Sequence, residues 1–213
     1  MYESFDDYVS QYVSAVPFGL VEEIEQEIGG IHIKTMVMEY SDGRSYYEKA
    51  HVVLTRGERK YECFCIDEHQ WDELFSFLQL EGKQYLCFRK TLYGFTLIDA
   101  ETLEEAYDYF PSQVLDGHES FIFLNAWGYR NFIVFNGCWW ACPEVYYIYD
   151  YRNKKVLDVF DTFSVFSHNG EVSIENDELV LDCTDGDDRI VKLRLGYQEL
   201  CDLMNLHGSA GFE

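Results

Sequence analysis

A run of short β-strands between residues 82 and 195 is the feature of this sequence that most limits its fold. Apolar, β-branched and aromatic residues gather there in segments of four to seven residues, and turn signals such as Asn169-Gly170 separate them. Spacing of about eight to twelve residues is typical of antiparallel meanders. We therefore expect a mainly β (α+β) fold with an antiparallel sheet meander, arranged as a sandwich, a barrel or propeller-like blades. The expected strands are 84–88, 94–99, 120–125, 131–136, 145–151, 155–160, 164–167, 171–175, 178–183 and 189–195.

The remaining segments contain both the three- to four-residue spacing of helices and the two-residue alternation of strands. Residues 4–16 place apolar side chains at three- and four-residue steps, which predicts an N-terminal helix. By similar patterns we expect further short helices over 19–28, 67–79 and 197–206, and strands over 31–40, 51–55 and 60–66. The chain of 213 residues is long enough for one compact domain, with an α+β portion over 1–80 and an antiparallel β portion over 81–213.

The charge of the chain is strongly negative and unevenly spread. Acidic residues outnumber Lys and Arg by 39 to 16, and residues 91–150 contain a single basic residue, Arg130. Such a surface repels phosphates, so we expect neither direct nucleic-acid binding nor binding to anionic membranes. It attracts a protein with a basic surface. Residues 91–129 are the first candidate for that contact, with the acids Asp99, Glu101, Glu104, Glu105, Asp108, Asp116 and Glu119.

The cysteine and histidine residues form no motif that indicates catalysis. The sequence contains no G-x-S-x-G, no H-E-x-x-H and no glycine-rich phosphate loop. Cys63 and Cys65 together with Cys138 and Cys142 are candidate zinc ligands, but neither pair has the C-x-x-C spacing of structural zinc sites. An acidic N-terminus without a secretory pattern and an odd number of cysteines favour reduced thiols in the cytoplasm. We expect no metal and no cofactor.

Aromatic residues are concentrated in one stretch of the β portion. Trp139 and Trp140 stand together in a connection between two strands, and Tyr147 and Tyr149 share one face of the next strand. Large rings of this kind either pack in a core or form a contact surface. Because such rings also stack on sugars, we keep a small-ligand or carbohydrate site with these four residues as an alternative.

The segment Gly137-Cys138-Trp139-Trp140-Ala141-Cys142-Pro143, followed by Tyr147-Ile148-Tyr149-Asp150, resembles a motif of an uncharacterised bacterial group. The resemblance extends over residues 84–160 and implies a propeller-like β meander. It implies no reaction and no ligand.

We therefore expect a non-catalytic, acidic, cytoplasmic binding protein. One concrete form is an inhibitor or immunity-type protein whose carboxylates occupy the basic cleft of a nucleic-acid-processing enzyme. A small-ligand or carbohydrate-binding module that uses the Trp and Tyr residues is the alternative.

Overall fold

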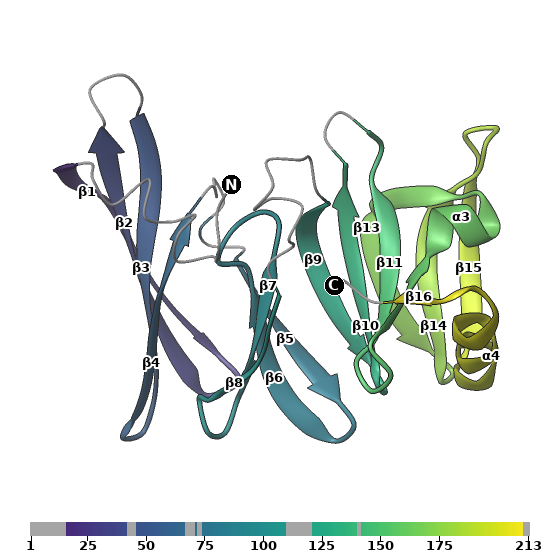
Figure 1. Ribbon diagram of the computed structural model, residues 1–213, viewed down its shortest axis with the longest axis horizontal. Coiled ribbons are helices and arrows are strands. Elements are labelled where there is room, and N and C mark those ends of the chain that lie inside the picture. Colours follow the sequence, from purple (N-terminus) through teal and green to yellow (C-terminus); the bar gives the residue numbers. More distant parts are fainter. Residues whose placement is uncertain are drawn as a thin grey trace. The chain divides into compact units, whose positions relative to one another are not determined.

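The computed structural model describes residues 16–41, 46–66, 71, 74–109, 121–139 and 142–210. This part of the chain is mainly β, with four small antiparallel sheets and two short helices (Figure 1). The sheets that it contains form no closed barrel and no propeller, so the barrel and propeller-like alternatives are wrong. Neither helix has the length and the apolar composition that crossing a membrane requires. Contacts divide the chain into unit 1, residues 1–77 and 84–119, and unit 2, residues 78–83 and 120–213.

Unit 1 contains a core that two antiparallel sheets share. In the first sheet Ile31, Ile33 and Val37 are buried while His32 between them is exposed, because side chains of a strand alternate between its faces. These residues meet Leu86 of the second sheet in one apolar cluster. The first sheet has the order β1 (Val16–Ile28), β2 (Ile31–Ser41), β3 (Tyr46–Arg56), β4 (Arg59–Ile66). The second has the order β5 (Phe75–Leu80), β6 (Lys83–Phe88), β7 (Phe95–Asp99), β8 (Glu105–Tyr109). Residues 78–83, which are the end of β5, the β5–β6 turn and the first residue of β6, belong to unit 2.

The helix expected over 19–28 is wrong, because these residues belong to the edge strand β1. Ile24 and Ile28 pack against the core, whereas Glu25 and Glu27 are exposed, so the segment follows a period of two. Glutamate favours helices, but pairing with β2 from Val16↔Ser41 to Ile28↔Ile31 outweighs that preference. Exposed charges on an edge strand also discourage pairing with another chain.

The other two helices expected in the N-terminal part have different outcomes. The helix expected over 4–16 lies outside the described residues apart from Val16, which begins β1. Within 67–79, residues from Phe75 onward form β5 rather than a helix. Trp71 and Leu74 are nevertheless buried, and the Trp71 indole N–H donates to Glu48 at 2.9 Å.

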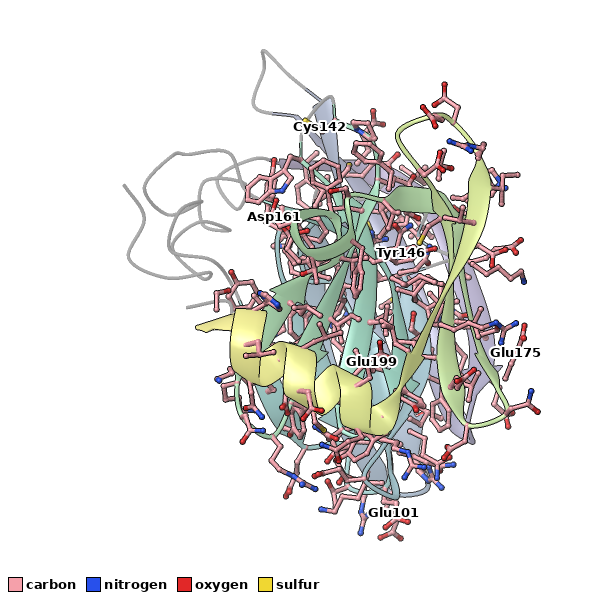
Figure 2. All side chains as sticks on the ribbon, turned by 90° about the vertical axis from the view of Figure 1, so that its right-hand side faces the viewer. Glu101, Cys142, Tyr146, Asp161, Glu175 and Glu199 are labelled. Atoms are coloured by element: carbon pink, nitrogen blue, oxygen red, sulfur yellow. The ribbon has the colours of Figure 1, made fainter. Side chains whose placement is uncertain are left out.

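Unit 2 also places its core between two sheets, with a helix added. Tyr146 and Ile148 of one sheet and Leu179 and Leu181 of the other are fully buried in one cluster, and Figure 2 shows Tyr146 among the strands. The five-stranded sheet has the spatial order β16 (Ser209–Ala210), β12 (Lys155–Asp158), β11 (Val145–Asp150), β10 (Phe132–Cys138), β9 (Ile122–Tyr129). The three-stranded sheet has the order β13 (Phe166–Glu175), β14 (Glu178–Thr184), β15 (Ile190–Gly196).

Two helices complete unit 2. The helix expected over 197–206 is confirmed as α4 (Tyr197–His207), which buries Leu200 and Met204. The short helix α3 (Val159–Phe163) replaces the end of the strand expected over 155–160. It begins there because Asp158 caps it, accepting a hydrogen bond from the backbone N–H of Asp161 at 3.1 Å.

Candidate functional site

The turn between β7 and β8 contains three of the acidic residues that the sequence pointed to. The Asp99 carboxylate accepts hydrogen bonds from the backbone N–H groups of Glu101 and Thr102, at 2.9 and 3.0 Å, and so shapes this turn. Glu101 and Glu104 are exposed, and Figure 2 shows Glu101 among side chains that project beyond the ribbon. Asp99 thus has a structural role, while Glu101 and Glu104 face solvent.

Two arginines hold this turn through its backbone carbonyls, and within the described residues neither forms a salt bridge with its carboxylates. The Arg56 guanidinium donates to the backbone carbonyl of Ala100 at 2.7 Å and to that of Gly29 at 3.2 Å. Arg59 donates to the backbone carbonyl of Glu101. Glu58 lies between the two arginines in the β3–β4 turn and is exposed.

We call the three carboxylates of Glu58, Glu101 and Glu104 the acidic end of unit 1. Within the described ranges, none of the three forms a salt bridge. The neighbouring guanidinium groups bind backbone carbonyls instead. The acidic end therefore keeps charges that a cationic partner can reach.

Glu105 and Asp108 share an ion pair with one lysine within the unit. The Lys90 ammonium lies 3.0 Å from a carboxylate oxygen of each residue. Burial lowers the pKa of Lys90, but Asp108 and Glu105 outweigh it and the pKa is raised above its ordinary value. Tyr61 also donates to Glu105, at 2.9 Å. These two carboxylates contribute to the internal structure of unit 1 more than to a free surface.

The predicted Trp and Tyr residues are partly brought together in unit 2. The ring of Phe121 lies 4.5 Å from that of Tyr147 and 6.0 Å from that of Trp139, measured between centroids, and we call these three residues the aromatic cluster. Trp139 is 40% exposed. Burial, the charge of Asp158 and a hydrogen bond to it raise the pKa of Tyr147, which keeps its hydroxyl protonated.

The other predicted residues do not join these sites in the described structure. Tyr149 is fully buried in β11, whose six residues are all buried, so its ring has a packing role. Asp116, Glu119 and Trp140 lie outside the described residues.

No disulfide joins the cysteines within the described residues. Cys63 and Cys65 lie on the core-facing side of β4, as their spacing predicts, and Cys142 is exposed. Among the residues that the structure describes, no three His, Cys, Asp or Glu side chains are placed to hold a metal ion.

Sequence reasoning missed two arginines that line a cavity in unit 2, Arg130 and Arg152. Each lies in a turn between strands, where no motif marks it. The one available signal was that Arg130 is the single basic residue between 91 and 150.

Comparisons with protein-family models, with curated proteins and with solved structures found no match for this chain.

Proposed function

We propose that this protein is a non-catalytic binding protein whose acidic end engages a basic surface on a partner protein. An inhibitor or immunity-type protein that blocks the basic cleft of a nucleic-acid-processing enzyme is the form that we favour. The observation that carries the proposal is the arrangement around the β7–β8 turn. There Arg56 and Arg59 bind backbone carbonyls, and the carboxylates of the acidic end form no salt bridge in the described structure.

The physics of such a surface favours fast association. A chain with a net charge of −23 attracts a cationic partner over a distance that the ionic strength sets, with a Debye length of about 8 Å in physiological salt. Carboxylates that form no salt bridge within their own protein gain more from a partner's Lys and Arg, because no existing ion pair has to be broken. The turns that carry them are held by hydrogen bonds, so little ordering is required on binding.

The test begins with the immobilised full chain and a lysate of its source cells at low salt, with mass spectrometry of the retained proteins. The association rate of each retained protein is then measured with the wild type and with the double variant Glu101→Gln/Glu104→Gln. We expect a basic partner, and an association rate that falls about threefold to tenfold in the double variant and on raising the salt.

The matched control is Glu171→Gln/Asp188→Asn, which removes the same charge from exposed positions of unit 2. Equal effects of the two double variants would show that only net charge matters and would contradict a docking role for the acidic end. Retained partners without a basic surface, or with salt-independent association, would contradict it as well.

A second candidate function rests on the aromatic cluster. The Trp139 indole is 40% exposed and offers a stacking surface. Tyr147 and its hydrogen-bond partner Asp158 belong to the same region, and the Asp158 carboxylate can accept hydrogen bonds from sugar hydroxyls. We propose a carbohydrate or other small ligand there as the alternative. Tryptophan fluorescence during a titration with a glycan panel tests it, with Trp139→Ala as the control. Unchanged fluorescence across the panel would remove this candidate.

A further inference from the structure

Unit 2 contains a cavity of about 600 Å³ that the acidic end and the aromatic cluster do not involve. Four turns contribute to its wall. Glu81 and Gly82 come from the β5–β6 turn, Arg130 from the β9–β10 turn, Arg152 from the β11–β12 turn and Asp177 from the β13–β14 turn. The cavity therefore lies where these turns converge within one unit.

The two arginines are the cationic groups of the cavity wall. The Arg130 guanidinium pairs with Asp177 and that of Arg152 with Glu81. Their side chains remain 47% and 61% exposed. A guanidinium offers five N–H donors in a planar fork, so a single carboxylate leaves donors for a further oxyanion.

The turns that carry the arginines are held in place by hydrogen bonds. The buried Asp150 carboxylate accepts from the Asn131 side chain at 2.9 Å and from the Arg152 backbone N–H at 3.0 Å. The backbone N–H of Glu81 donates to the Arg130 carbonyl at 2.8 Å, which joins the β5–β6 turn to the β9–β10 turn. The arginine positions therefore exist before any ligand arrives, and binding needs little reorganisation.

Another part of the wall is apolar and aromatic. The Tyr197 ring lies 5.0 Å from the Arg130 guanidinium carbon, which orients that guanidinium by a cation–π contact. Tyr129 is fixed because its hydroxyl donates to the Asp177 carbonyl at 2.7 Å. Ile174 adds an aliphatic side chain that is 55% exposed.

We propose that this cavity binds a small organic oxyanion, a phosphate or carboxylate attached to an apolar ring. The oxyanion binds the guanidinium forks of Arg130 and Arg152, and the ring packs against Tyr197 and Ile174. Glu81 and Asp177 balance the two arginines, so the cavity is locally neutral within an acidic protein. The Asp177 side chain is 70% exposed and can turn into water when the oxyanion replaces it.

Isothermal titration calorimetry of the full chain tests the proposal with phenyl phosphate and phenylacetate as probes. Comparing the two shows whether the cavity prefers a phosphate or a carboxylate. Benzyl alcohol, which lacks the charge, and inorganic phosphate, which lacks the ring, are the comparison compounds. We expect one of the two probes to bind with a Kd of about 1 mM or lower, and both comparison compounds to bind more weakly.

The variant Arg152→Gln is expected to weaken binding about tenfold, whereas Arg152→Lys retains part of it because the charge remains without the planar fork. Arg189→Gln is the matched control, since Arg189 is an exposed, ion-paired arginine of unit 2 outside the cavity wall. In NMR spectra of the wild type, chemical-shift changes of the Arg130 and Arg152 backbone amides on adding the probe give a readout that needs no variant.

Three results would overturn the proposal. Neither probe binds with a Kd of about 1 mM or lower, or Arg189→Gln weakens binding as much as Arg152→Gln, or the shifted resonances lie elsewhere in the chain. The proposal stands apart from the acidic end, which belongs to unit 1, so either can fail alone.

Discussion

The side-chain amide of Asn131 donates to the carboxylate of Asp150 at 2.9 Å, and both residues are 3% exposed. The backbone repeats the link, since the N–H of Tyr151 donates to the carbonyl of Asn131 at 2.9 Å. Asp150 also accepts from Arg152, and from the backbone and side chain of Asn153. One buried carboxylate thus organises two turns of unit 2.

Replacing this carboxylate is expected to destabilise the protein strongly. Asp150→Ala leaves the buried Asn131 amide and two backbone N–H groups without their acceptor, and we expect a loss of about 2–4 kcal/mol in the free energy of unfolding. Urea unfolding measures it. Glu171→Ala, at an exposed position of β13, serves as the control and should change stability by less than about 0.5 kcal/mol. Equal losses in both variants would show that Asp150 does not organise the turns.

A second prediction concerns Gly137, which lies where the register between β9 and β10 shifts. A Cβ there would lie 2.1 Å from the backbone carbonyl oxygen of Ile122 and 2.4 Å from the Phe121 ring. Because a backbone atom cannot move aside cheaply, Gly137→Ala is expected to cost about 1–3 kcal/mol or more. Gly186→Ala is the control, since nothing lies within 4 Å of its Cβ position. If both variants show the same melting temperature, the close approach at Gly137 is wrong.

Much of the β architecture could be predicted because its strands alternate or are uniformly apolar. Segments such as 178–183 and 189–195 became β14 and β15 with boundaries within a residue or two. The same reasoning failed at β1, where four glutamates suggested a helix and pairing with β2 decided otherwise. It also missed β8, because Glu105-Ala106-Tyr107-Asp108-Tyr109 contains few of the apolar residues that mark a buried strand.

The candidate sites were harder to predict, because charge partners come from distant segments. Lys90 pairs with both Glu105 and Asp108 only because β6, β7 and β8 pair in that order. The cavity likewise depends on four turns that are spread along the sequence. A sequence shows how many charges there are, but the fold decides which of them remain exposed.

A third prediction concerns the reactivity of the thiols. Burial raises the pKa of Cys87 to about 12 and that of Cys183 to about 11, so both stay protonated at neutral pH, whereas Cys142 is exposed. Since the thiolate is the reactive form, we expect iodoacetamide to modify Cys142 first and to leave Cys87 and Cys183 intact in the native protein. Peptide mass spectrometry over time measures this. Modification of Cys87 at the rate of Cys142 would show that its burial is wrong, and a urea-unfolded sample confirms that every thiol can react.

The last prediction is a loss of stability at alkaline pH. Burial raises the pKa values of Tyr109, Tyr146 and Tyr147 above the ordinary value of about 10. A group with a raised pKa in the folded state binds its proton more tightly there than in the unfolded chain. Its contribution to stability is therefore complete below pH ~10 and is lost as the pH rises through the folded pKa. We expect the free energy of unfolding to fall above pH ~10, with tyrosinate absorbance and loss of structure rising together. Titration of all tyrosines near pH ~10 in a protein that is still folded would contradict the burial of these rings.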